Sequence, residues 1–134
     1  MGQLTTTYDD VQHCTAEFAS KAKSVTMDCP YTGKGEELSP GNVLEAALAG
    51  CMLMSMGAVA TRDGIDLKKA EIEGELVGTR PPKIGYDAIS VFIRMPIGID
   101  RSYRATLERA ADACPIKHSF DPRIRVSTVF GYFD

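Results

Sequence analysis

The chain has 134 residues and a formal net charge of −3, from 15 Lys and Arg against 18 Asp and Glu. Its composition, 44% apolar and 25% charged, is that of an ordinary globular protein and excludes a mostly disordered chain. The length predicts one domain over residues 1–134. A weakly acidic chain without a basic run is a poor partner for nucleic acid or an anionic membrane, so neither is expected.

Cysteine usage indicates the compartment. The four cysteines, Cys14, Cys29, Cys51 and Cys114, are too few for a disulfide scaffold, and none lies in a C-x-x-C pair. The segment MGQLTTTYDD has neither the basic nor the apolar region of a signal peptide. It does match the M-G-x-x-x-[ST] myristoylation pattern, which is short and therefore carries little weight. We therefore expect a cytoplasmic protein, in which a cysteine is either buried packing or a reactive group.

The first half of the chain predicts strands followed by a long helix. Residues 4–28 are β-prone stretches broken by polar residues, typical of short antiparallel strands. Residues 29–38 carry proline and two glycines and predict a loop. Ser39-Pro40 then provides an N-cap and a first-turn proline, and Gly64 provides a stop.

The predicted helix is apolar on nearly every face, since only Glu45 is charged between Val43 and Ala60. This pattern predicts a buried helix, and the charge and short span disfavour a membrane segment. A small chain cannot bury all the sides of so apolar a helix by itself. Pairing two such helices in a homodimer would bury them, so a homodimer is favoured. Small residues that would let a second helix approach lie along it, at Ala46, Ala47, Gly50, Gly57 and Ala58.

The second half predicts two strands, a helix and a last strand. Residues 69–77 alternate apolar residues with glutamates, and residues 86–95 place apolar residues at every second position. Residues 101–114 have helical spacing and are followed by Pro115, which is expected to close the helix. Residues 123–130 alternate again, so the order of elements predicts an α+β fold.

Two cysteines lie at comparable predicted positions, both facing the interior. Cys51 is midway along the long helix, and Cys114 is the last residue on the apolar face of the second helix. Spacing alone favours inert packing for both, because free cysteine is among the most buried residue types.

Two motifs resemble the OsmC/Ohr family of osmotically inducible and organic hydroperoxide resistance proteins. They are SPGNVLEAALAGC at 39–51 and ADACPIKHSF at 111–120. RDGIDLKKAEIEGE at 62–75 and the Gly-Lys-Gly loop at 33–35 are similar to the family as well. The resemblance implies the OsmC-like α+β fold, with antiparallel sheets around a long buried helix and an intertwined homodimer whose sites lie at the interface.

The resemblance also implies a chemistry. Cys51 would be the thiol that a peroxide oxidises, and Cys114 the thiol that resolves the sulfenic acid into a disulfide. The substrate would be an organic hydroperoxide, the reductant an external dithiol, and no cofactor or metal is expected. An apolar wall from Met52, Leu53, Met54 and Met56 would suit such a substrate.

The chain departs from the peroxidase branches of the family at the activating pair. Those branches use an arginine from an N-terminal strand, held by a glutamate shortly before the first cysteine. Here no arginine precedes Arg62, and helical geometry turns Glu45 away from Cys51. Residues that could substitute are His13, His118, Arg80, Arg94, Arg123 and Arg125.

Other readings of the cysteines stay open. Cys114 and His118 have metal-ligand spacing, but Pro115 breaks the helix between them and disfavours a metal site. The protein could instead be a non-enzymatic module that binds a small apolar or thiol-reactive molecule, or both cysteines could be packing residues. Cys14 and Cys29 are expected to be incidental thiols.

Overall fold

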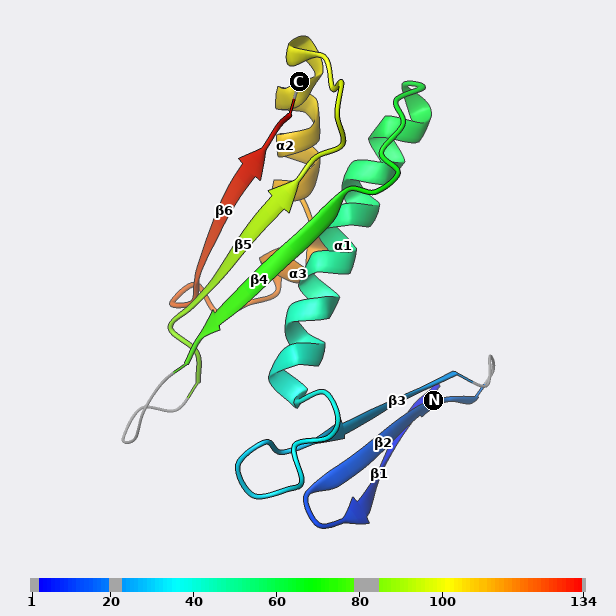
Figure 1. The fold of residues 1–134 in the computed structure, drawn as a ribbon, viewed down its shortest axis with the longest axis vertical. Coiled ribbons are helices and arrows are strands. Elements are labelled where there is room, and N and C mark those ends of the chain that lie inside the picture. The colour runs from blue at the N-terminus through cyan, green and yellow to red at the C-terminus, as the bar shows by residue number, and fades with distance from the viewer. Residues whose placement is uncertain (1–2, 20–22, 79–84, 134) are drawn as a thin grey trace. The chain divides into compact units, whose positions relative to one another are not determined.

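The computed structural model describes residues 3–19, 23–78 and 85–133, with the element order shown in Figure 1. By their contacts these residues form two compact units, residues 1–44 and residues 45–134. The fold is α+β with two small sheets and a long helix, as predicted. That the whole chain is one domain stays a prediction.

The first unit contains a three-stranded antiparallel sheet. Its strands are β1 (Leu4–Asp10), β2 (His13–Phe18) and β3 (Lys23–Asp28), in the order β1-β2-β3. The short strands and their antiparallel pairing confirm the prediction for residues 4–28.

The loop after β3 is tied down by a buried carboxylate. Asp28 is 3% exposed, and its two oxygens accept the backbone N–H groups of Glu36 at 2.9 Å and Glu37 at 3.2 Å. Such bonds offset the cost of burying a charge. Gly33 has no room for a side chain, because a Cβ there would lie 2.7 Å from the Cys29 carbonyl oxygen.

Helix α1 (Pro40–Arg62) begins at the predicted cap. The Asn42 N–H donates to Ser39 Oγ at 3.1 Å, and the Ser39 N–H donates to Asn42 Oδ1 at 3.0 Å. This reciprocal pair satisfies amides that a helix start leaves without partners, with proline at the first helical position.

The second unit contains a mixed sheet. Strands β4 (Glu71–Val77) and β5 (Ala88–Arg94) pair antiparallel, but β5 pairs with β6 (Arg125–Gly131) in parallel. The prediction of antiparallel sheets is therefore wrong for this one pair. A parallel neighbour needs a crossover, and the helical segment between β5 and β6 provides it.

That crossover consists of three short helices: η2 (Arg101–Tyr103), α2 (Arg104–Asp112) and α3 (Pro115–His118). Pro115 was expected only to close a helix. Instead α2 ends at Asp112, and Pro115 is the first residue of α3, a position where its missing N–H costs nothing. Cys114 lies between the two helices.

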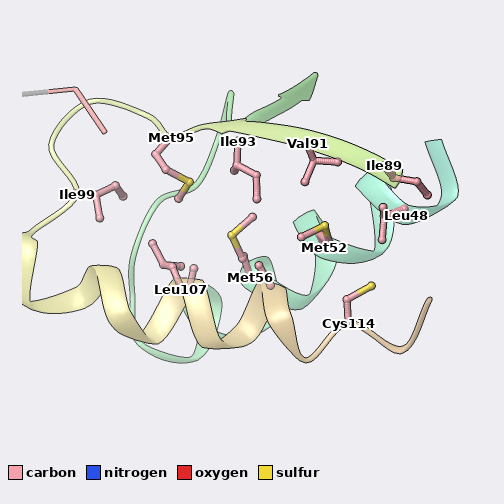
Figure 2. Packing of buried hydrophobic residues seen from close by; sticks show 12 residues of the cluster. Leu48, Met52, Met56, Ile89, Val91, Ile93, Met95, Ile99, Leu107 and Cys114 are labelled. Atoms are coloured by element: carbon pink, nitrogen blue, oxygen red, sulfur yellow. The ribbon is translucent and has the colours of Figure 1, made fainter. Parts of the chain in front are cut away.

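The core of the second unit lies between one face of the β4–β6 sheet and helices α1 and α2 (Figures 1 and 2). The central strand β5 contributes every second residue, as the alternation predicts. Helix α1, strand β5 and helix α2 contribute the residues of this core that are fully or nearly fully buried: Leu48, Met52, Met56, Ala60, Ile89, Val91, Ile93, Leu107 and Ala111.

Helix α1 is buried along one stripe only. Its buried residues recur every fourth position, whereas Met54 is 76% exposed. Only 22% of its most apolar 18-residue stretch is buried, although the helix is long and apolar enough to cross a membrane. The prediction of a helix buried on nearly every face is thus not met within the described residues of one chain, where Met54 in particular is left exposed.

Candidate functional site

Cys51 lies on α1 directly before the buried residue Met52. It is half-buried and packs against the core of the second unit. Its position follows from the helix period, which places residue 51 at the border of the stripe formed by residues 48, 52 and 56. The side chain is therefore reachable from one side and supported on the other.

Cys114 belongs to the core itself. It is 0% exposed and lies at one end of the buried row, near Met52 and Leu48 in Figure 2. Its backbone, at φ −53° and ψ 124°, leaves the helical conformation between α2 and α3. The backbone of Ile116, in the turn that follows, acts on Cys51 of α1.

The two cysteine side chains lie beside each other, and each shifts the pKa of the other. All four cysteines of the chain are free thiols. The bond to Cys114, the backbone N–H of Ile116 and the side chain of Ser55 together lower the pKa of Cys51 below its ordinary value. These donors stabilise the thiolate, which is the nucleophilic form of a cysteine.

The partner thiol is shifted in the opposite direction. Burial raises the pKa of Cys114, and the bond to Cys51 raises it further. The opposite shifts make Cys51 the more acidic of the two thiols. A more acidic thiol beside a second thiol is the arrangement that disulfide chemistry requires.

The turn that carries Cys114 is held by several polar contacts. The His118 N–H donates to the Cys114 carbonyl at 3.3 Å, and Ser119 Oγ donates to the Pro115 carbonyl at 2.9 Å. Asp112 provides two more, since its carbonyl oxygen lies 2.8 Å from His118 Nε2 and its carboxylate forms an ion pair with Lys117.

The helices that carry the two thiols are joined near the end of α1. Tyr103 Oη, at the start of α2, lies 2.9 Å from the Val59 carbonyl oxygen and 2.7 Å from Asp63 Oδ2. Asp63 also pairs with Arg62, and the two contacts lower the pKa of its carboxyl to about 2. The end of α1 and the residue after it, residues 59–63, are thereby held beside the start of α2.

None of the described arginine candidates lowers the pKa of Cys51. Arg94 lies over the rings of Phe92 and Phe133, at 5.8 and 5.6 Å, and its Nε is 3.4 Å from Glu71. Arg123 pairs with Asp121 at 2.7 Å, Arg125 is exposed on β6, and Arg80 lies outside the described residues.

The two histidines have other partners. His118 is bonded to the Asp112 carbonyl, and His13, in the first unit, pairs with Asp9 at 2.9 Å. Glu45 lies against Gly74 of β4, where its carboxylate occupies the space that a Cβ would need. It is absent from the groups that shift the pKa of Cys51, in line with its predicted direction.

The predicted methionine wall is divided. Met52 and Met56 are fully buried in the core, Leu53 packs against its edge, and Met54 is exposed. These four residues therefore do not form one surface beside Cys51 within a single chain. The reason is the helix period, which rotates neighbouring residues by about 100° each.

Cys29 has a perturbed environment that the sequence analysis missed. The Thr32 side chain and the backbone amides of Thr32 and Tyr31 lower the pKa of Cys29, in the loop after β3. The Thr32 N–H lies 3.5 Å from its sulfur. The signal was the turn-forming stretch CPYTGKG, which directs several amides at one atom.

The part of the chain that the structure describes contains no cluster of three His, Cys, Asp or Glu side chains suited to a metal ion. His118 and Cys114 have the spacing of a ligand pair, but the His118 ring is bonded to a backbone carbonyl.

The sequence profile of OsmC-like proteins matches residues 33–129, which include both cysteine motifs. The chain belongs to the OsmC-like protein family. No match was found among curated proteins. Solved structures with the same fold match nearly the whole length of this chain.

A Psychrobacter arcticus protein, named for osmotic stress induction and a detoxification response, is 25% identical with a TM-score of 0.91. The match covers 98% of this chain and 96% of that one. A Legionella pneumophila organic hydroperoxide resistance protein OsmC is 16% identical, with a TM-score of 0.73 and 98% of each chain covered. The Bacillus subtilis organic hydroperoxide resistance protein OhrB is 16% identical, with a TM-score of 0.70, covering 97% of this chain and 98% of that one.

Proposed function

We propose that this OsmC-like protein is a thiol-dependent peroxidase that reduces organic hydroperoxides in a stress or detoxification role. The observation that carries the proposal is the adjacent pair of Cys51 and Cys114, in which the first thiol is the more acidic and the more exposed. The similarity to proteins named for organic hydroperoxide resistance supports the choice of substrate.

In the proposed reaction the Cys51 thiolate attacks the terminal oxygen of the hydroperoxide. The O–O bond breaks, an S–O bond forms, and the alkoxide takes a proton from solvent to leave as an alcohol. Cys51 is then a sulfenic acid, and the peroxide has received two electrons. A weakly hydrated organic peroxide suits a thiol that adjoins an apolar core better than hydrogen peroxide does.

Cys114 completes the oxidation. Its sulfur displaces hydroxide from the sulfenic acid, water leaves, and a Cys51–Cys114 disulfide remains. Because the two thiols already lie beside each other, the sulfurs need only move into bonding contact, and no distant segments need to meet. An external dithiol then reduces the disulfide by exchange, which restores both thiols, and the proposed setting is the reducing cytoplasm.

The test is a count of free thiols after addition of cumene hydroperoxide to reduced protein that carries Cys14→Ser and Cys29→Ser. We expect two thiols to disappear per equivalent of peroxide, and to return when a dithiol is added. Cys29 must be replaced because its own lowered pKa would otherwise add a reactive thiol. Retention of both thiols at excess peroxide would overturn the proposal and favour the binding module instead.

The proposed unit is a homodimer, because α1 leaves apolar surface exposed within the described residues of one chain, Met54 above all. A Cβ built on Gly50 or Gly57 meets nothing within 4 Å. Glycine inside a helix costs about 1 kcal/mol relative to alanine, so the small residues need a reason that one chain does not provide. Close approach of a second α1 provides it.

A Gly57→Leu variant tests the dimer. We expect it to keep its helical circular dichroism, because a Cβ at Gly57 meets nothing within 4 Å in the single chain, but to sediment as a monomer where the original protein is a dimer. Ala105→Leu, at an exposed position of α2, adds a similar side chain elsewhere and should leave sedimentation unchanged. A dimeric Gly57→Leu protein, or a monomeric original, would contradict the homodimer.

A further inference from the structure

We infer that Asp112, Lys117 and His118 are positioning residues, which hold the Cys114 thiol inside the protein throughout the cycle and so direct the external dithiol to the sulfur of Cys51. These three residues are called the latch below. The inference rests on the proposed function for the roles of the two thiols, and it deepens that function because it names the disulfide sulfur that the reductant attacks.

The two sulfurs of the pair differ in access. Cys51 is half-buried on α1, whereas Cys114 is 0% exposed and lies at one end of the buried row in Figure 2. A second chain can add cover to either residue, but it cannot uncover Cys114. Because thiol–disulfide exchange depends on access to the attacked sulfur, a closed turn excludes attack on Cys114.

The latch joins the residues on the two sides of Cys114. Asp112 is the last residue of α2, and Lys117 and His118 are the last two residues of α3. The Asp112 carboxylate forms an ion pair with Lys117, and His118 Nε2 donates to the Asp112 carbonyl oxygen at 2.8 Å. The His118 N–H adds a bond to the Cys114 carbonyl at 3.3 Å, so the turn is closed around the cysteine.

The latch can persist when the thiols are oxidised. Its contacts use two carbonyl oxygens and the Asp112 carboxylate as acceptors, so a disulfide at the Cys114 sulfur does not remove them. The latch also lies on the outer side of the turn, where the Asp112 side chain is 67% exposed. Substitutions can therefore loosen it without a change in the apolar core.

Acidity alone would direct the reductant to the other sulfur. Attack on Cys114 would release Cys51, which is the more acidic thiol and hence the better leaving group. The buried position of Cys114 opposes this preference. Access and acidity thus give opposite predictions, and the sulfur that is attacked distinguishes them.

In the inferred exchange a thiolate of the dithiol attacks the Cys51 sulfur of the oxidised protein. A new S–S bond forms there, the Cys51–Cys114 bond breaks, and Cys114 leaves as a thiolate that takes a proton. The second thiolate of the reductant then attacks the reductant's own sulfur in the mixed disulfide and releases Cys51. The protein gains two electrons and two protons, and the dithiol leaves as a disulfide.

The latch is tested in reduced protein that carries Cys14→Ser and Cys29→Ser, with a short pulse of N-ethylmaleimide read by peptide mass spectrometry. We expect Cys114 to be labelled far more slowly than Cys51, because a buried thiol reacts only while the turn is open. Urea should change this slow rate little below the unfolding transition, since opening one turn exposes little surface.

Latch variants should speed the labelling of Cys114. Lys117→Met and His118→Leu should each raise its rate about threefold, and the double variant about tenfold. Lys117→Arg keeps the ion pair and should restore the slow rate. Lys68→Met removes the same charge at an exposed position and should change nothing. Equal labelling in the parent and the double variant, or a parent rate that rises steeply with urea, would overturn the latch.

The site of attack is tested on the disulfide form, prepared with diamide. Glutathione has one thiol and cannot complete the exchange, so a brief reaction that is stopped with acid leaves its adduct on the attacked cysteine. We expect the adduct on Cys51 in the parent, and on both Cys51 and Cys114 in the double latch variant. An adduct mainly on Cys114 in the parent, or the same distribution in both proteins, would overturn the inference.

The two assays contain no peroxide, which separates this inference from the proposed function. A protein that shows the expected labelling and adducts but does not consume cumene hydroperoxide would contradict the proposed function and leave the latch standing. A protein that consumes the peroxide through Cys51 but carries the glutathione adduct on Cys114 would do the reverse. Failure of diamide to form the Cys51–Cys114 disulfide would overturn the inference.

Discussion

Replacement of Cys51 by serine is expected to reduce the consumption of cumene hydroperoxide to the rate observed without protein. The variant keeps a donor and acceptor of similar size at the half-buried position, so the fold and the contact with Cys114 should remain. A serine hydroxyl does not ionise near neutral pH and cannot form a sulfenic acid. The measurement is peroxide loss in the presence of dithiothreitol.

Cys114→Ser is the matched control for this result. It should still consume one equivalent of peroxide, because Cys51 is intact, but it should accumulate sulfenic and then sulfinic acid at residue 51 because no resolving thiol is present. Unchanged peroxide consumption by Cys51→Ser would show that a different group reacts, with Cys29 the first to examine because of its lowered pKa.

The second large effect, a loss of stability, is expected in the apolar core against which Cys51 and Cys114 pack. Ile93 is fully buried on the central strand β5, and Ile93→Ala should lower the free energy of unfolding by about 2–5 kcal/mol. The loss combines the removed apolar contacts with the cavity left between the sheet and the two helices. The measurement is urea denaturation followed by circular dichroism.

Ile97→Ala makes the same chemical change at a residue that is 78% exposed. It should alter the free energy of unfolding by no more than about 0.5 kcal/mol. Equal losses for the two variants would contradict the placement of the core. If the protein is a dimer, both variants must be compared at one protein concentration, since association adds to apparent stability.

Local patterns predicted the elements of this chain well. Alternation in 86–95 is a direct consequence of a strand with one buried face, and β5 buries the residues that it indicates. The cap at Ser39-Pro40 is likewise a local signal, and the hydrogen bonds at Ser39 confirm it.

Long-range pairing was not predictable in the same way. The parallel contact between β5 and β6 depends on where the crossover returns the chain, which no short pattern encodes. In α1 the apolar residues occur on every face, so their periodicity could not identify the stripe that one chain buries.

The candidate site was reached from the sequence only through the family motifs. Cys51 and Cys114 are far apart in the chain, and spacing alone favoured packing for both. The donors around Cys51 could not have been found, because a backbone amide such as that of Ile116 leaves no trace in residue type. The absence of an arginine before residue 62 showed only that a familiar activator was missing.

The most direct test of the account is the identity of the bond formed on oxidation. Reduced protein is treated with one equivalent of cumene hydroperoxide, alkylated, digested without reductant and analysed by mass spectrometry. The account predicts a peptide pair joined by a Cys51–Cys114 disulfide as the main product, with Cys14 and Cys29 alkylated. A protein that consumes the peroxide but yields any other main disulfide, or none, would contradict it.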